Sequence, residues 1–331
     1  MGLSATSPSV TGGSSAKERS SSAKGKTSTL CPPPAHGKSH AAKSGGREVV
    51  KPPASHPPAA SLTYLVLALT TIIVVAPLGW VVASSMTTRQ TVWKNVLPFS
   101  WRAFFPAEFS ITGYRQIFQA GFGRTMINTF GVGIATVIFS IVVCSLAGFA
   151  FARFEFRGKK VLWAITLISF MVPYEATVIP AYTLVNDLGW INTWQALIVP
   201  AIANGTVIFL FRQFFADIPQ ELLDAARVDG ATWPRLMAGI VLPITRPVLV
   251  TSAILVFLAQ WNSFFWPMLV APDPKYRIVQ VAVNLLGVDQ QTTYWDRLFA
   301  ATTIAALIPL LLVIPLQRYY VSSIANSGIK G

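Results

Sequence analysis

The chain has 331 residues, of which 53% are apolar and only 12% are charged. Because soluble domains carry about 25% charged residues, this composition indicates a protein with several membrane spans. The net charge of +13 is not gathered in one patch, and much of it lies between apolar runs, as in cytoplasmic loops. We therefore expect no nucleic-acid partner.

Residues 1–60 are rich in Ser, Ala, Gly, Pro and Lys, and they carry eight Lys or Arg residues against two acidic ones. Such a segment buries too little apolar surface to offset the entropy of ordering, so we expect a disordered basic tail. All three histidines lie in it, which leaves residues 61–331 without a histidine for a metal site or a catalytic centre. We expect a tail at 1–60 and one transmembrane domain at 61–331, with no enzyme activity and no bound cofactor or metal.

Six apolar segments follow the tail, and each is near the length of about 20 residues that a helix needs to cross the hydrocarbon layer. They cover residues 62–85, 126–152, 161–184, 194–215, 244–266 and 299–316. Pro173 and Pro180 interrupt the third segment. The pattern predicts an all-α integral membrane protein with six transmembrane helices.

The loops between these segments predict the orientation. The loop after the second segment carries Arg153, Arg157, Lys159 and Lys160, whereas residues 186–193, after the third, carry no Lys or Arg. Since cytoplasmic loops are enriched in Lys and Arg, the first of these loops is expected inside and the second outside. Six crossings then place both termini, and the loop between the fourth and fifth segments, in the cytoplasm.

This last loop, within residues 217–247, reads as two short helices joined by a turn. Pro219 and Glu221 suit the first turn of a helix, where a missing N–H costs nothing and a negative charge meets the helix dipole. Gly230 suits the end of that helix. Thr232 can cap a second helix that has Pro234 in its first turn.

Four residues of the first helix have the spacing i, i+3, i+4, i+7 and are expected to share one face. They are Leu222, Ala225, Ala226 and Asp229. The small residues in the middle of this face would let the backbone of another protein approach closely.

The same loop resembles the cytoplasmic loop of permease subunits of ABC importers, which has the form E-A-A-x3-G-x9-I-x-L-P. Seven positions of this chain stand at that spacing: Asp224, Ala225, Ala226, Gly230, Ile240, Leu242 and Pro243. The one departure is Asp224, which keeps the charge of the usual Glu on a side chain shorter by one methylene.

Further stretches resemble the carbohydrate-uptake branch of this family, which includes the maltose-system G subunit and the glycerol-3-phosphate-system E subunit. They are residues 128–129, 147–154, 188–193, 211–215, 261–267 and 317–321. The resemblance covers about residues 62–321 and leaves the tail outside it.

The resemblance implies a bacterial cytoplasmic membrane protein that forms half of a solute path for a sugar or sugar-like compound. The implied partners are a second homologous permease, two copies of a cytoplasmic ATPase that binds ATP and Mg²⁺, and an external solute-binding protein. It also implies that the loop at 224–243 docks in the ATPase. The expected coupling residues are Glu221, Asp224, Ala225, Ala226, Asp229, Gly230, Ile240, Leu242 and Pro243.

Polar groups at membrane depth are costly, and this makes them candidates for the solute path. The candidates are Glu175, Asn204, Gln260, Trp261 and Asn262. Four of them also have a structural interpretation: Glu175 near the outer surface or paired with a neighbouring subunit, Asn204 and Gln260 in hydrogen bonds between helices, and Trp261 in an interfacial aromatic belt.

Three alternatives stay open at this point. The solute could be glycerol 3-phosphate or a related polyol phosphate within the same machinery. An ion-coupled secondary transporter would need an intramembrane network of titratable groups, for which Glu175 alone offers itself, and usually internal repeats, which the sequence does not show. A membrane anchor whose function resides in the tail would need a folded module there, and the composition of the tail argues against one.

Overall fold

A computed structural model describes residues 58–328, apart from residues 95, 97, 99, 170, 290 and 291. They fall in a compact unit that begins at Pro58. The three histidines, Cys31 and nearly all of the predicted tail lie outside the described residues.

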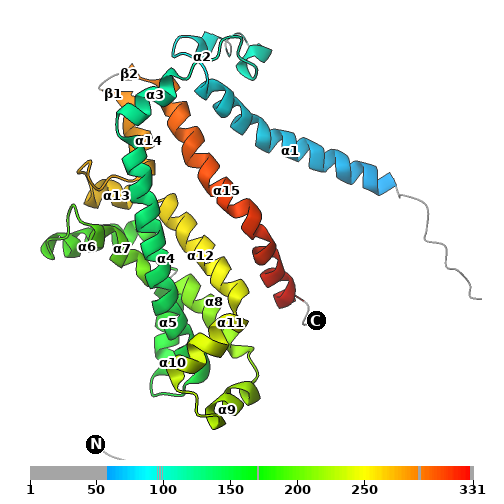
Figure 1. Ribbon diagram of the computed structural model, residues 1–331, viewed down its shortest axis with the longest axis vertical. Helices are drawn as coiled ribbons and strands as arrows, with labels where there is room; N and C mark the ends of the chain where they lie inside the picture. Colours follow the sequence, from blue (N-terminus) through cyan, green and yellow to red (C-terminus); the bar gives the residue numbers. More distant parts are fainter. Residues whose placement is uncertain are drawn as a thin grey trace, which may run out of the picture. The chain divides into compact units, whose positions relative to one another are not determined.

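Three long helices dominate the fold (Figure 1). They are α1 (Pro58–Ser85), α4 (Phe122–Arg153) and α15 (Trp295–Gly328). Each contains a stretch long and apolar enough to cross a membrane: Leu62–Ser85, Phe122–Arg153 and Trp295–Leu316. These stretches coincide with the first, second and sixth predicted segments.

The third, fourth and fifth predicted segments are helical but broken. The third consists of α5 (Lys159–Ser169) and α6 (Tyr174–Asp187). The fourth consists of α7 (Trp194–Ile202) and α8 (Gly205–Ala216), which meet at 41°. The fifth is α12 (Arg246–Trp261), bent by 85° from the helical run Trp233–Ile244 before it. The described residues thus hold three spans, or six if each bent pair crosses as one.

Shorter elements connect these helices. Before α4 lie α2 (Thr91–Lys94), a 3₁₀ turn η1 (Trp101–Ala103) and α3 (Thr112–Gln119). After α12 lie α13 (Phe265–Val270) and α14 (Val279–Gly287). A minimal antiparallel pair, β1 (Val288–Asp289) with β2 (Thr292–Thr293), is the one strand pair among the described residues, and its register pairs Val288 with Thr293.

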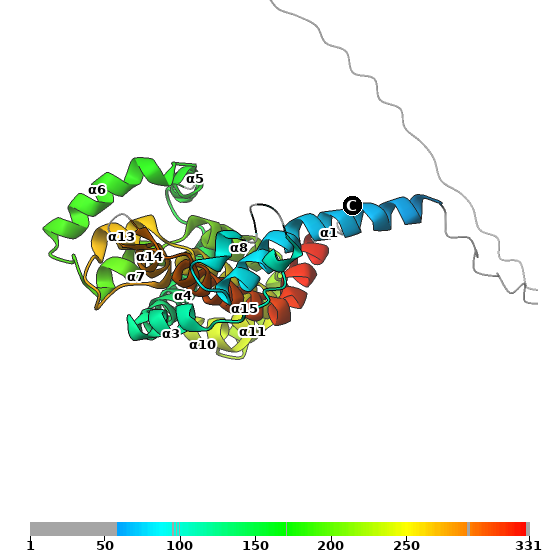
Figure 2. The ribbon, with the colours of Figure 1, turned by 90° about the horizontal axis from the view of Figure 1, so that it is seen from above.

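The helix α4 is the central packing element. It lies against α7, α8 and α12, while α15 packs against α1, α3, α12 and α14. Figure 2 shows α5 and α6 to one side of α4, and α1 reaching away on the other side past α15. None of the most apolar stretch of α1 is buried, and Ile73 is 71% exposed. A helix surface of this kind is stable against lipid or another subunit rather than against water.

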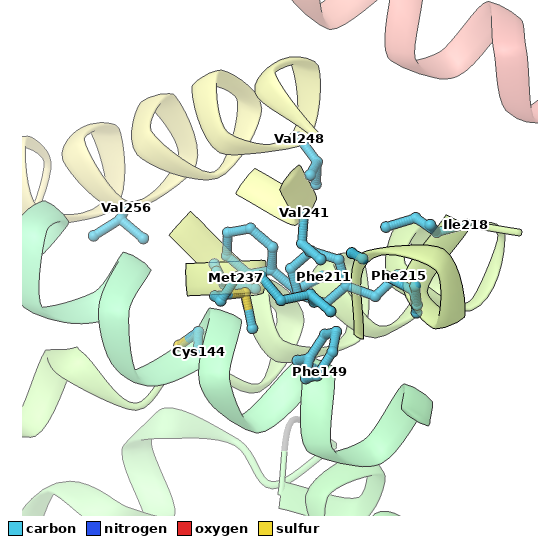
Figure 3. Packing of buried hydrophobic residues seen from close by; sticks show 13 residues of the cluster. Cys144, Phe149, Phe211, Phe215, Ile218, Met237, Val241, Val248 and Val256 are labelled. Atoms are coloured by element: carbon cyan, nitrogen blue, oxygen red, sulfur yellow. The ribbon is translucent and has the colours of Figure 1, made fainter. Parts of the chain in front are cut away.

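Helices α4 and α8 approach each other closely at Gly148. A Cβ atom there would lie 2.6 Å from Cβ of Phe211 and 3.0 Å from the backbone nitrogen of Arg212. Small residues at helix contacts permit such backbone approach in membranes. The contact belongs to the α4–α8 cluster (Figure 3), whose buried members are Cys144, Phe149, Val207, Phe211, Phe215, Ile218, Leu223, Ala226, Leu236, Met237, Val241, Val248 and Val256.

Candidate functional site

Residues 217–243 fold at one end of the bundle as two helices with a turn between them, as predicted. The first helix is α9 (Gln220–Val228), with Pro219 immediately before it and Glu221 in its first turn. Gly230 ends it with a φ of +81°, a left-handed conformation that glycine adopts without steric cost. The second helix is α10 (Trp233–Leu236).

Thr232 occupies the N-cap position of α10, but its side chain makes no capping hydrogen bond, in contrast to the prediction. A cap side chain accepts from the N–H of the second or third helical residue. The second residue of α10 is Pro234, which has no N–H. One of the two N–H groups that usually donate to a cap side chain is therefore missing.

A single π-helical turn, η2 (Met237–Val241), follows α10 and leads into α11 (Leu242–Ile244). Pro243 supplies the reason, because it lacks the N–H that would bond to the carbonyl of Gly239 in an α-helix. The N–H of Leu242 instead bonds to the carbonyl of Met237, five residues back. Of the motif residues here, Ile240 and Leu242 are half-buried against the α4–α8 cluster.

Helix α9 has an inner and an outer side. Leu223 and Ala226 face inward, at 2% and 8% exposure, and belong to the α4–α8 cluster. Ala226 is therefore not part of the open face that the sequence predicted, because its i, i+3 spacing with the larger Leu223 makes these two the buried stripe. The carbonyl of Ala226 also accepts from the N–H of Ala231, which fixes the turn at Gly230.

The outer side of α9 is open and mixed in character. Its exposed residues include Glu221, Leu222, Asp224, Ala225, Val228 and Asp229. Val228 is 88% exposed, an apolar side chain at the end of the helix. The carboxylate of Asp224 accepts from Nε2 of Gln220 at 3.0 Å, one turn earlier. This surface offers apolar contact and negative charge to a partner.

Arg153, at the end of α4, ties that helix to the beginning of α9. Its guanidinium donates to Oε1 of Gln220 at 3.2 Å and to the carbonyl oxygen of Ile218. Arg153 was expected only among the cations of a cytoplasmic loop, although a cation directly after an apolar span was a usable signal for this contact.

A group of aromatic rings adds a second connection between the end of α4 and the helices α9 and α10. Phe149 and Phe154 lie 5.9 Å and 4.9 Å, between ring centroids, from Trp233. The guanidinium of Arg227, on α9, lies 4.8 Å from the centroid of the same Trp233 ring. The turn between α9 and α10 is therefore held against the end of α4.

Two solute-path candidates serve in helix packing. Gln260 is buried and donates from Nε2 to the carbonyl of Leu197 in α7 at 2.8 Å. Trp261 is 1% exposed and donates from Nε1 to the carbonyl of Ala305 in α15 at 3.0 Å. The pair fixes α12 between two neighbours, which matches the structural interpretation of Gln260; Trp261 lies in the core rather than in an interfacial belt.

The other three candidates, Asn204, Asn262 and Glu175, lie at the ends of helices. Asn204 caps α8, since its Oδ1 accepts from the N–H of Val207 at 3.2 Å. Asn262 is exposed at the end of α12, and Glu175 is exposed in the first turn of α6. Within the described part of the chain, no group of three or more His, Cys, Asp or Glu side chains could hold a metal ion.

Comparison with known proteins supports the resemblance found in the loop. Residues 145–325 match the family model described as binding-protein-dependent transport system inner membrane component. The sn-glycerol-3-phosphate transport system permease protein UgpE of Agrobacterium fabrum is 30% identical over 270 residues, which cover 80% of this chain and 96% of that protein. The arabinooligosaccharides transport system permease protein AraQ of Halalkalibacterium halodurans is 32% identical, over 69% of this chain and 82% of its own length.

The fold has a solved counterpart. A chain in the crystal structure of a bacterial ABC transporter involved in the import of the acidic polysaccharide alginate superposes with a TM-score of 0.70 at 19% identity, over 79% of this chain and 95% of that one. The chain belongs to the family of binding-protein-dependent transport system inner membrane components, and it is a transport permease subunit rather than an enzyme or an ion-coupled carrier.

Proposed function

We propose that this chain forms half of the path of an importer for a sugar or a sugar-like solute. The relatives support this class, because their names specify glycerol 3-phosphate and arabinooligosaccharides. Glycerol 3-phosphate or a related polyol phosphate is the alternative within the same machinery. The partners are a second homologous permease, an external solute-binding protein and two copies of an ATPase that binds ATP and Mg²⁺.

The proposed topology has six crossings, with each bent helix pair counted as one, and a cytoplasmic tail at residues 1–60 before a permease domain at 61–331. The distribution of Lys and Arg supports it, since the loop at 153–160 carries four cations and the loop at 186–193 carries none. Both termini and α9 then lie on the cytoplasmic side of the bacterial membrane.

We place the contact with the ATPase at α9, and one observation carries this proposal. The short helix is held by Leu223, Ala226 and Arg153 on its inner side, while its outer side exposes Leu222 and Val228. Unpartnered apolar side chains on a fixed helix suit insertion into a cleft of another protein. Four of the other predicted residues are exposed on α9 or at its end: Glu221, Asp224, Ala225 and Asp229. Gly230 forms the turn that follows the helix.

The α4–α8 cluster supports a lever role for α9. Leu223 and Ala226 pack in one cluster with Phe211 and Phe215 of α8 and with Met237 of η2. Close-packed interiors transmit displacement rather than absorb it. A displacement of α9 is therefore transmitted to α8 and, through Ile240, Leu242 and Pro243, to α12.

Replacement of Gly230 by Trp tests the contact. A Cβ atom at Gly230 meets nothing within 4 Å, so the new ring projects into the partner's space without disturbing the fold beyond the left-handed backbone cost. We expect normal membrane insertion with loss of uptake and of ATPase co-purification. Gly230→Asn is expected to retain activity, because Asn tolerates the left-handed region.

Gly189→Trp is the matched control, since Gly189 has a φ of +68° and equally open surroundings in the loop that is expected outside. It should leave uptake near the wild-type level. Comparable uptake in Gly230→Trp and wild type would reject the assignment of α9 as the ATPase contact.

A further inference from the structure

A cavity of about 540 Å³ lies beside the end of α4, between the beginning of α5 and the middle of α8. Its walls include three cationic side chains, Lys159, Lys160 and Arg212, and three aromatic ones, Phe151, Phe156 and Trp163. Neither the solute path nor the α9 contact uses it.

The charge of the cavity is positive and largely unpaired. Lys159 donates to Glu155 at 2.8 Å, but Glu155 is 88% exposed, and a pair of this kind is weak in water. Glu155 is the one carboxylate among the residues that line the cavity, so Lys160 and Arg212 face no second carboxylate within it. Three cations against one carboxylate leave an excess of two positive charges facing the cavity.

Aromatic rings hold one of these cations, Arg212, in place. The guanidinium of Arg212 lies 4.4 Å from the centroid of Trp163, and the ring of Trp163 is in turn flanked by Phe151 at 5.3 Å and Phe209 at 6.1 Å. A guanidinium stacked on an indole keeps its N–H groups free at the edge of the plane. Arg212 is thus oriented to donate to a planar or tetrahedral anion.

The surface next to the cations is apolar. Helix α5 has no buried residue, and Val161, Leu162, Ile165 and Ile168 are all between 48% and 63% exposed. Its 11 residues rise about 16 Å at 1.5 Å each, which is close to half of a hydrocarbon layer about 30 Å thick. An anion site at one end of an apolar surface one leaflet deep is complementary to a phospholipid, whereas a soluble phosphate compound needs no such surface.

The cavity lies at the same end of the bundle as α9, because Arg153, two residues after Phe151 in its wall, bonds to Ile218 and Gln220. Figure 1 shows α5 in the half of the bundle that ends at α9. On the proposed topology this is the cytoplasmic leaflet, which presents anionic lipids to juxtamembrane cations. We propose that the cavity binds the headgroup of an anionic phospholipid, with Lys159, Lys160 and Arg212 around its phosphate and an acyl chain along α5. The choice of leaflet rests on the proposed topology.

Native mass spectrometry of the full-length chain in detergent tests the site, with phosphatidylglycerol or phosphatidylcholine added in titration. Wild type is expected to bind phosphatidylglycerol in preference to phosphatidylcholine. Replacement of Lys159, Lys160 and Arg212 by Gln should weaken that binding by about fivefold for each cation removed. The charge-retaining set of Lys159→Arg, Lys160→Arg and Arg212→Lys should preserve it. Lys94→Gln with Arg102→Gln, exposed cations near α2 and η1, is the control that should change nothing.

Three results would overturn the proposal. The first is equal retention of phosphatidylglycerol by the Gln variant and wild type. The second is displacement of the lipid by inorganic phosphate or sn-glycerol 3-phosphate at equal concentration, which would assign the cavity to a soluble phosphate compound. The third is loss of a co-purifying subunit with lipid binding unchanged, which would make it a protein contact. Because none of these measurements requires transport, each result is independent of the uptake test at Gly230.

Discussion

The contact between α4 and α8 gives the sharpest test of the packing, through Gly148→Ala. The new Cβ would lie 2.6 Å from Cβ of Phe211, 3.0 Å from the nitrogen of Arg212 and 3.2 Å from the carbonyl oxygen of Ile208. Atoms in contact prefer a separation of about 3.5–4.0 Å. All three neighbours are fixed by the backbone of α8, so no rotamer change relieves the overlap and the helices must separate by about 1 Å.

Gly131→Ala is the matched control in the same helix. Nothing lies within 4 Å of its Cβ position, so the substitution removes the conformational freedom of glycine without a clash. That gain is about 0.5–1 kcal/mol, whereas overpacking of a filled contact costs about 1–3 kcal/mol. Gly148→Ala carries the same gain, so the two variants should differ in stability by the overpacking cost alone, about 1–3 kcal/mol, with Gly131→Ala the more stable.

Thermal unfolding of the purified chain in one detergent measures the difference. At an unfolding entropy of about 2.1 cal/mol/K per residue, a change of 1 kcal/mol moves the midpoint of a 331-residue chain by about 1.4 °C, so Gly148→Ala should melt about 1.5–4 °C below Gly131→Ala. Equal midpoints for the two variants would refute the close approach of α4 and α8, and with it the rigid connection from α8 to α9.

Three further predictions follow from particular contacts. Arg153→Met removes the donors to Ile218 and Gln220, so uptake per inserted chain should fall several-fold. Arg153→Lys should restore part of the uptake. Unchanged uptake in the Met variant would show that Arg153 does not hold α9 against α4. In a Cys31→Ser background the single thiol is Cys144, which is fully buried, and a maleimide should label it only after denaturation. Gln260→Ala should lower the melting midpoint through loss of a bond worth about 0.6–1.7 kcal/mol between membrane helices, with the solute dependence of uptake retained; a changed solute preference would instead return Gln260 to the solute path.

The helical segments were predictable because their signal is local. An apolar run of about 20 residues specifies a membrane helix whatever surrounds it, and the structure has helices over all six runs. The break before α6 was also predictable from a local signal, because Pro173 fixes its own φ and removes a backbone hydrogen-bond donor. Gly230 was equally readable, because few residues other than glycine accept its left-handed backbone.

The orientation of α9 was not predictable from its own residues. Leu222 and Leu223 are adjacent and equally apolar, and only the position of the α4–α8 cluster decides that Leu223 is inside at 2% exposure and Leu222 outside at 40%. The π turn shows the same dependence on context. The sequence predicts that Pro243 cannot donate a backbone hydrogen bond, but it does not predict the π-helical bond from Leu242 to Met237. Gln260 and Trp261 were chosen by residue type, whereas their partners, the carbonyls of Leu197 and Ala305, stand 63 and 44 residues away.

The inner side of α9 explains why the motif combines small residues with one larger apolar neighbour. A helix of nine residues is too short to be stable alone in water, so its structure depends on what it packs against. Leu223 supplies the burial, and the small Ala226 lets the helix lie close to the bundle. The carbonyl of Ala226 separately accepts from the N–H of Ala231 and fixes the turn at Gly230. Ala225 then remains outside with no side-chain bulk beyond Cβ, which leaves the backbone of α9 accessible. The two adjacent alanines thus have different surroundings, since Ala225 is exposed and Ala226 is packed against the bundle.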